Sequence, residues 1–224
     1  MCSSDLKCAE VCRFDAVEVR DGVYTIKDID CEGCGYCARV CPAGAIDMKP
    51  RNVGTWHVSG TRLGCTMVHA RLGIGAENSG KLVAKVKNEA KRAAEETGKR
   101  IVLVDGSPGI GCPVVSSLSG ADFVVLVTEP TVSGLHDLRR VHELVRKFKI
   151  PGGCIVNKAD LNEEMTREIV DFLRKEKILL LSRLPYDESF TDAMVAGKTI
   201  VEFSPGPLEK ALREAWRLRS EEHT

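Results

Sequence analysis

The chain has 224 residues, of which 43% are hydrophobic and 29% are charged, a composition typical of a folded globular protein. Lysine plus arginine and aspartate plus glutamate both number 32, so no net positive field favours binding to nucleic acid or to an anionic membrane. No apolar run approaches the ~20 residues that a membrane-spanning helix needs.

The cysteines are concentrated at one end of the chain. Seven of the ten lie within the first 41 residues, and the others are Cys65, Cys112 and Cys154. Disulfide frameworks of extracellular proteins rarely have this distribution, so metal ligation in a reducing compartment is the better interpretation, and we expect a cytoplasmic protein. For the three scattered cysteines, burial in an apolar core is the default expectation.

Residues 31–42 read CEGCGYCARVCP, which is the pattern CxxCxxCxxxCP. Three cysteines at successive three-residue steps wrap one face of a 4Fe-4S cluster, and the fourth reaches a second cluster. Structural zinc sites instead use two pairs of ligands that a dozen or more residues separate. The spacing therefore favours iron–sulfur ligation over zinc.

An internal repeat supports this interpretation. KCAEVCRFDAVEV at 7–19 aligns without gaps on YCARVCPAGAIDM at 36–48, and a turn at Asp21-Gly22 lies between the copies, flanked by short alternating strands. Residues 7–50 resemble the two-cluster bacterial ferredoxin domain. The resemblance implies that one 4Fe-4S cluster is held by Cys12, Cys31, Cys34 and Cys37. It also implies that Cys8 and Cys41 hold a second cluster together with two upstream ligands.

The first six residues do not fit this pattern. The repeat places the two upstream ligands at Cys2 and Asp5, and Asp5 stands where a cysteine is expected. The string MCSSDL equals the translation of a common sequencing-library adapter from a GTG start, so our hypothesis is that residues 1–6 are non-native. The alternative is a genuine aspartate ligand, in which a hard carboxylate replaces a soft thiolate. Both residues are doubtful ligands.

At about residue 51 the cysteine-rich sequence gives way to strand and helix patterns. Residues 54–73 alternate as two strands would, and a helix is predicted after Ser79, a plausible N-cap, with Gly98 at its end. The apolar run Ile101–Val104 predicts a strand that is buried on both faces and ends at Asp105.

Strands and helices then alternate to the end of the chain. The strands are predicted at 123–127, 153–156 and 178–181, and the helices at 134–148, 162–175 and 207–219. This alternation predicts an α/β fold with a parallel sheet that helices flank on both sides, next to the small α+β ferredoxin-like domain. Ligands of such sheets bind beyond the carboxyl ends of the strands.

Unusual loops follow the predicted strands. They read DGSPG at 105–109, EPTVSG at 129–134, NKAD at 157–160 and LPYDE at 184–188. Any one of them alone is an ordinary turn, but their succession predicts a nucleotide site. Asp105 could hold Mg²⁺ through water, Asn157 could bind a purine edge, and Asp160 could orient its loop.

These loops closely resemble those of MinD/ParA-type P-loop ATPases, specifically the group with an inserted ferredoxin domain. The resemblance covers residues 7–224 and implies ATP, Mg²⁺ and a homodimer in the intact protein. It implies that Asp105 is the Walker B aspartate, that Gly109 is the hinge of switch II, and that Asn157 and Pro185 contact adenine. Residues 51–224 would be the C-terminal part of the nucleotide-binding domain.

The chain departs from this family at the phosphate-binding loop. It has no GxxxxGK[ST] motif, and SGKL at 79–82 lacks the upstream glycine and has Leu82 where Ser or Thr would hold Mg²⁺. We therefore expect an N-terminally truncated fragment with weak or no ATPase activity.

The functional hypothesis is that nucleotide state is coupled to electron transfer through the ferredoxin module, towards a redox partner that the sequence does not identify. The alternative is an iron–sulfur carrier or assembly ATPase, whose partner would be a cluster-acceptor protein. A membrane-bound positioning ATPase is disfavoured because no basic amphipathic helix ends the chain.

Overall fold

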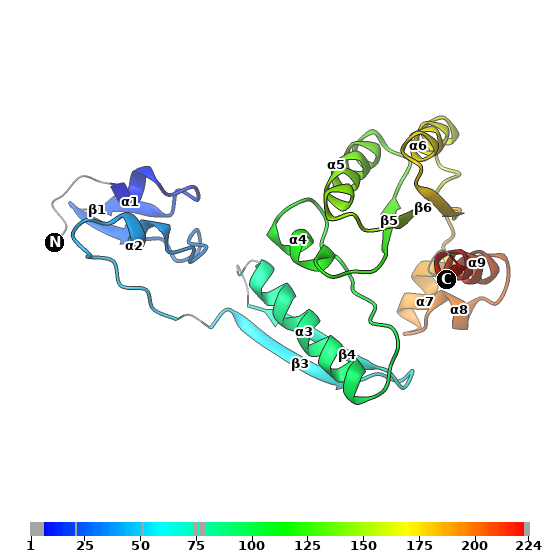
Figure 1. Ribbon diagram of the computed structural model, residues 1–224, viewed down its shortest axis with the longest axis horizontal. Helices are drawn as coiled ribbons and strands as arrows, with labels where there is room; N and C mark the ends of the chain where they lie inside the picture. The colour runs from blue at the N-terminus through cyan, green and yellow to red at the C-terminus, as the bar shows by residue number, and fades with distance from the viewer. Residues whose placement is uncertain (1–6, 21, 51, 74–75, 77–78, 222–224) are drawn as a thin grey trace. The chain divides into compact units, whose positions relative to one another are not determined.

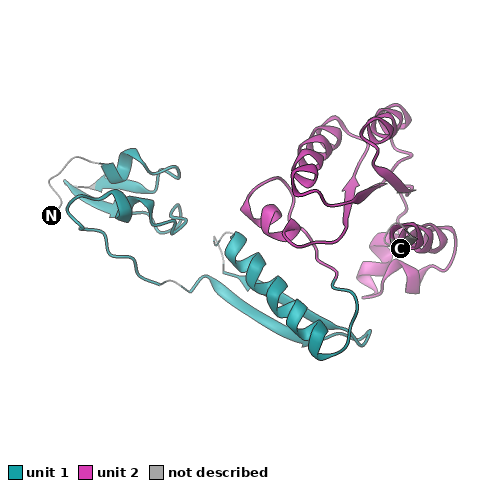
Figure 2. Cartoon of the chain, in the orientation of Figure 1, with its two compact units in different colours: residues 1–102 teal, residues 103–224 magenta. Residues whose placement is uncertain are grey.

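The computed structural model describes residues 7–20, 22–50, 52–73, 76 and 79–221 (Figure 1). The adapter hypothesis for residues 1–6, and the doubtful ligands Cys2 and Asp5, lie outside the described residues. The chain divides into two compact units, residues 1–102 and 103–224 (Figure 2). The boundary predicted at residue 50 falls inside the first unit and stays a prediction.

The cysteine-rich segment forms two short helices and a hairpin. Its elements are α1 (Lys7–Glu10), β1 (Val17–Arg20), β2 (Val23–Ile26) and α2 (Tyr36–Val40). β1 and β2 pair antiparallel with Val17 opposite Ile26, and Gly22 has a positive φ of 74° at the turn between them. The predicted hairpin is therefore confirmed.

A second hairpin packs against a long helix in the same unit. β3 (Gly54–Gly60) pairs antiparallel with β4 (Thr66–Leu72), and α3 (Gly80–Glu96) packs on β4. The Ser79 side chain accepts a hydrogen bond from the amide of Leu82, so the predicted N-cap is confirmed. Gly98 has a φ of 66°, the left-handed conformation that favours glycine just after a helix.

The predicted strand at Ile101–Val104 is wrong. This segment is irregular and its side chains are exposed, Leu103 to 82%. A strand buried on both faces needs a hydrogen-bonded neighbour on each edge, and among the described residues no strand pairs with this segment. Asp105 therefore follows an irregular stretch of chain, not the end of a strand.

The second unit is built on a parallel sheet with the order β5-β6-β7. The strands are β5 (Val124–Thr128), β6 (Gly152–Val156) and β7 (Leu179–Arg183), and the helices between them are α5 (Val132–Phe148) and α6 (Glu163–Glu176). Thr131 and Asn162 cap the two helices with their side chains. The predicted alternation of strands and helices is confirmed, with boundaries displaced by one or two residues.

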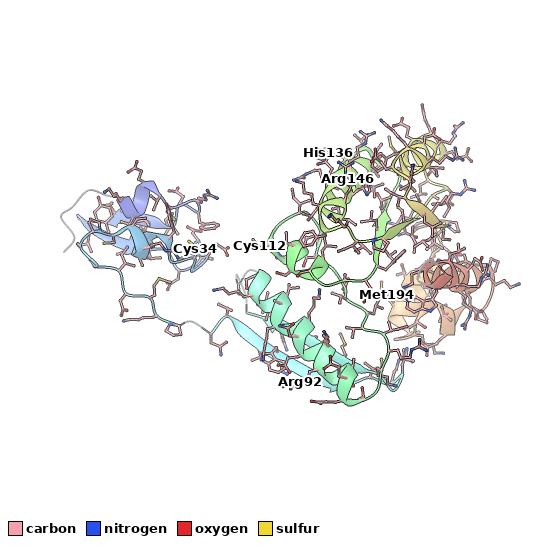
Figure 3. The ribbon with its side chains drawn as sticks, in the orientation of Figure 1. Cys34, Arg92, Cys112, His136, Arg146 and Met194 are labelled. Carbon is pink, nitrogen blue, oxygen red and sulfur yellow. The ribbon has the colours of Figure 1, made fainter. Side chains whose placement is uncertain are left out.

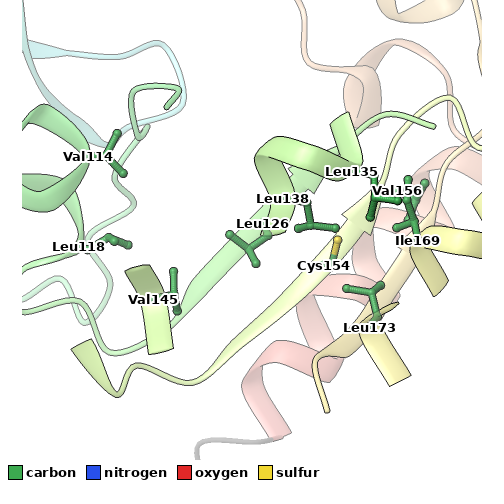
Figure 4. Packing of buried hydrophobic residues seen from close by; sticks show 10 residues of the cluster. All are labelled: Val114, Leu118, Leu126, Leu135, Leu138, Val145, Cys154, Val156, Ile169 and Leu173. Carbon is green, nitrogen blue, oxygen red and sulfur yellow. The ribbon is translucent and has the colours of Figure 1, made fainter. Parts of the chain in front are cut away.

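The core of this unit lies between the sheet and the helices α4 (Cys112–Leu118), α5 and α6 (Figure 4). Cys154, Val156 and Ile169 are completely buried in it. On β5 the opposite face is open, because Val125 and Val127 are 43% and 65% exposed. The expected cover on both sides of the sheet is therefore incomplete over β5.

Three further helices complete the described chain. They are α7 (Ser189–Val195), α8 (Ile200–Phe203) and α9 (Pro207–Glu221). The sequence predicted only α9, which packs against β7 and buries Leu208 and Ala215. Over the residues that the structure describes, no helix has the length and apolar character needed to cross a membrane.

Candidate functional site

A cavity in the ferredoxin-like segment is lined by four cysteines. They are the four that the resemblance to two-cluster ferredoxins assigns to one cluster: Cys12, Cys31, Cys34 and Cys37. The side chains of Phe14, Val17, Ile26 and Met48 form much of the remaining wall. Sulfur ligands inside an apolar wall are the environment that a 4Fe-4S cluster requires, so the residues present fit the predicted group.

Backbone amides point at the sulfur atoms of this segment. The amide of Ala16 donates to Cys12 Sγ, that of Gly33 to Cys31 Sγ and that of Ala45 to Cys41 Sγ, each at 3.4 Å. Such bonds stabilise negative charge on a cysteine sulfur, and they are one of the means by which proteins adjust the potential of a bound cluster.

The pKa of Cys37 is raised, in the first place by burial. The amide of Ala38 opposes this shift, whereas the neighbouring Cys34 and Cys31 add to it by charge repulsion. Three thiolates crowded together repel one another until a cation binds between them, so ligation of iron would release the protons that the raised pKa retains.

Within the described ranges, no three His, Cys, Asp or Glu side chains lie close enough to hold one metal ion. This finding concerns a single-ion site, whereas a 4Fe-4S core spreads its four cysteines over the corners of a cube. Cys8 and Cys41 are half-buried and do not line the cavity described above. Their role in a second cluster stays a prediction, because Cys2 and Asp5 are outside the described residues.

The loops after β5, β6 and β7 meet at the carboxyl edge of the sheet. The amide of Asn157 donates to the carbonyl of Thr128 at 2.8 Å, which joins the second loop to the end of β5. The amide of Tyr186 donates to Asp160 Oδ1 at 2.7 Å, which joins the NKAD loop to the LPYDE loop. Pro185 directly precedes Tyr186, so three of the predicted nucleotide residues lie on connected loops.

An ion pair that the sequence does not predict lies at this edge. Lys158 Nζ lies 2.8 Å from Glu129 Oε1 and links the NKAD loop to the EPTVSG loop. Gly134 is the last residue of the EPTVSG loop. Only glycine fits there, because a Cβ at this position would collide with the carbonyl oxygen of Glu129. The position of Glu129 directly after β5 was the available signal, although the sequence alone does not pair it with Lys158.

The predicted switch residues lie in the irregular segment before α4. Asp105 is exposed, and Gly109 has a φ of 88°, which favours glycine. The structure does not place Asp105 at the end of a strand, so its Walker B role and the hinge role of Gly109 stay predictions. Figure 3 shows Cys34 on the loop before α2 and Cys112 at the start of α4.

Comparisons with known proteins separate the two parts of the chain. A family model described as a 4Fe-4S binding domain matches residues 24–47. Over 43 residues the chain is 49% identical to the formate dehydrogenase iron-sulfur subunit of Wolinella succinogenes, covering 19% of this chain and 22% of that protein. The MinD cell division protein of Aquifex aeolicus matches in structure with a TM-score of 0.54 and 22% identity, over 73% of this chain and 68% of that one. The chain joins a 4Fe-4S binding domain to a domain with the MinD fold.

A longer relative matches more than two thirds of the chain. The uncharacterised protein MJ0578 of Methanocaldococcus jannaschii is 34% identical over 156 residues, which is 70% of this chain and 53% of that protein. The chain thus spans about half the length of this relative. In the MinD-type domain, the connected loops at the end of β5, β6 and β7 form the candidate nucleotide edge, and in the 4Fe-4S domain the cysteine cavity forms the candidate cluster site.

Proposed function

We propose that the chain holds a 4Fe-4S cluster through Cys12, Cys31, Cys34 and Cys37, and that the complete protein couples electron transfer through this cluster to the nucleotide state of its MinD-type domain. The cavity lined by the four cysteines carries the first part of the proposal. A bound cluster supplies one-electron exchange with a protein partner. The likeness to an iron-sulfur subunit of formate dehydrogenase supports the same role.

The residues of the chain perform three tasks in this proposal. The four thiolates hold the iron atoms, and apolar side chains such as Phe14 and Ile26 limit the access of water. The amides of Ala16 and Gly33 donate to ligand sulfurs and so stabilise the added negative charge of the reduced state.

The nucleotide part of the proposal rests on the loops of the MinD-type domain. Asp160 binds the backbone of Tyr186, so its carboxylate orients the LPYDE loop. We propose adenine as the base, with Asn157 and Pro185 as its contacts. Mg²⁺ would be held through Asp105.

The cluster assignment is tested by anaerobic reconstitution with iron and sulfide. We expect about four iron atoms per chain and an EPR signal on reduction. Cys34→Ser should lower the iron content and weaken the EPR signal. Cys65→Ser should change neither quantity, because Cys65 lies in the β3–β4 turn and its Sγ is hydrogen-bonded to Thr61 Oγ1 at 3.0 Å. A wild-type chain that retains no iron or sulfide would contradict the proposal.

A carrier role is the second candidate, and the exposure of Cys34 favours it. An exposed ligand gives an acceptor protein access to one corner of the cluster. Transfer to an apo-acceptor in the presence of a chelator separates the two functions. Retention of the cluster on this chain would exclude the carrier role, and rapid chelator-resistant transfer would favour it.

Nucleotide coupling is tested in two steps. For this chain, calorimetry should show ATP binding weaker than micromolar and no measurable hydrolysis, because the GxxxxGK[ST] motif is not in its sequence. In the full-length gene product, Mg·ATP should shift the reduction potential of the cluster, and Asp105→Asn should abolish the shift. An unchanged potential at saturating Mg·ATP would contradict the coupling.

A further inference from the structure

The two copies of the sequence repeat adopt the same backbone turn, although they have different residues at the turn. Asp15 lies three residues after Cys12 and has a φ of 51°, and Gly44 lies three residues after Cys41 and has a φ of 58°. Both residues therefore adopt the left-handed conformation, at positions that are equivalent in the repeat.

Each left-handed residue is followed by an alanine whose amide returns to the cysteine. The amide of Ala16 donates to Cys12 Sγ and the amide of Ala45 donates to Cys41 Sγ, both at 3.4 Å and both four residues along the chain. The same contact in two copies indicates that the turn serves to aim this amide at the sulfur.

Neighbouring contacts fix the direction of the Ala16 amide. Ala16 is only 2% exposed, and its carbonyl accepts a hydrogen bond from the amide of Lys27 at 2.8 Å, directly after β2. With its carbonyl held in this way, the peptide that carries the Ala16 amide is oriented by the backbone angles of Asp15.

The two copies differ in the residue that makes the turn. Glycine adopts the left-handed conformation freely, whereas aspartate does so at a cost and brings a carboxylate. An amide donated to a ligand sulfur stabilises the reduced cluster, and a nearby negative charge destabilises it. Asp15 thus brings to its copy of the repeat an exposed negative charge that Gly44 does not bring to the other.

We propose that Asp15 is a positioning residue that sets the reduction potential of the cluster held by Cys12. Its backbone aims the Ala16 amide at Cys12 Sγ at 3.4 Å, which raises the potential, and its carboxylate lowers the potential by a smaller amount because it is exposed and screened by water. This inference rests on the proposed cluster binding and adds to it a specific determinant of the potential.

The test is an EPR-monitored redox titration of a series at position 15. Asp15→Asn and Asp15→Gly keep a residue that accepts the left-handed conformation but remove the charge, so their potentials should agree and lie above that of wild type. Asp15→Ala and Asp15→Val disfavour the turn, and their potentials should lie below that of wild type. Gly44→Ala, in the other copy, is the matched control and should leave this potential unchanged.

Equal potentials for the Asn, Ala and Val variants would overturn the proposal. If the Val variant does not fold, the milder Ala variant decides the point. An Ala variant that folds, by circular dichroism, but loses the cluster would also contradict it, because Asp15 would then hold the cluster and not set its potential. A wild-type chain with no cluster signal would contradict the proposed function itself, which is a different outcome from a bound cluster whose potential is unaffected by position 15.

Discussion

At the scale of single residues, the left-handed positions of the repeat have opposite consequences for stability. Asp15 bears the backbone cost of its φ of 51°, and Gly44 avoids it at a φ of 58°. No atom within 4 Å would meet a Cβ at Gly44, so a substitution there tests the backbone alone. We expect Asp15→Gly to stabilise the segment by about 0.5–1 kcal/mol and Gly44→Ala to destabilise it by about 1 kcal/mol.

Denaturant titration of the cluster-loaded chain, followed by cluster absorbance, measures both changes. Gly98→Ala is a useful comparison, because Gly98 has a φ of 66° outside the ferredoxin-like segment and should leave the loss of cluster absorbance unchanged. A Gly44→Ala variant that is as stable as wild type would show that the left-handed turn is not maintained in the loaded protein.

The reactivity of the cysteines gives a second prediction at this scale. Burial raises the pKa of Cys154 to about 12, so its thiol stays protonated and shielded. Cys65 and Cys112 are exposed, against the expectation of burial, because they lie in the β3–β4 turn and at the first position of α4. Alkylation of the native, cluster-loaded chain should therefore label Cys65 and Cys112 but not Cys154.

Mass spectrometry of the alkylated chain also tests the ligand set. Iron ligation should protect Cys12, Cys31, Cys34 and Cys37, and a chelator should expose Cys34 first, because it is the exposed member of the four. Equal labelling of Cys34 with and without the cluster would exclude it as a ligand.

At the scale of elements, α3 is held to its hairpin by a charged network. Glu89 is 9% exposed and binds Lys85 and Arg92, each at 2.7 Å, and Lys85 also lies over the ring of Trp56. The hydrogen bond from Lys85, with a smaller contribution from Arg92, lowers the pKa of Glu89 against the opposing effect of burial. The carboxylate is thus an ionised partner that joins the helix to β3 through Lys85.

This network predicts a pH-dependent effect of Glu89→Gln. The pKa of Glu89 is lower in the folded state than in the unfolded state. The stability that its ion pairs contribute is therefore fully present above the unfolded pKa of about 4.3, and it is lost as the pH falls through the folded pKa. At neutral pH the variant should show faster hydrogen exchange in α3 than wild type, and in acid the two should converge. Glu96→Gln, at a 67% exposed side chain, should have little effect. A difference between Glu89→Gln and wild type that stays constant into acid would refute the role of the ion pairs.

The elements that the sequence predicted correctly are those whose signal is local. α5 and α6 have capping residues and one apolar face, and β5, β6 and β7 are short apolar runs between them. Ile101–Val104 has the same apolar run, yet it is irregular. A buried strand depends on neighbours that its own sequence does not contain, so apolarity alone did not predict its structure.

In the candidate sites, too, local features were predicted from the sequence and features that depend on tertiary contacts were not. The resemblance to two-cluster ferredoxins, which rests on the cysteine spacing and the repeat, named the four cysteines that line the cavity, because those motifs are confined to a short loop and one repeat copy. The Glu129–Lys158 pair and the amide of Ala16 were missed, since both depend on how separate segments or backbone angles come together. Local motifs therefore named the cysteines that line the cavity, and the fold supplied the groups around them.

At the scale of the whole molecule, the cysteine cavity and the core of the MinD-type domain lie in different compact units. Ile169 is completely buried between α6 and the sheet, so Ile169→Ala should destabilise the second unit by about 2–5 kcal/mol through lost burial and a cavity. Because the unit boundary falls at residues 102 and 103, the substitution should leave the absorbance and EPR spectra of the cluster unchanged.

Thermal unfolding, monitored in parallel by circular dichroism and by cluster absorbance, separates the two units. Ile169→Ala should lower the transition seen by circular dichroism and leave the loss of cluster absorbance at the wild-type temperature. Val132→Ala, at a 76% exposed side chain on α5, is the matched control and should move neither transition. If both transitions fall together in Ile169→Ala, the units unfold as one, and a change in the MinD-type domain then affects the cluster through stability alone.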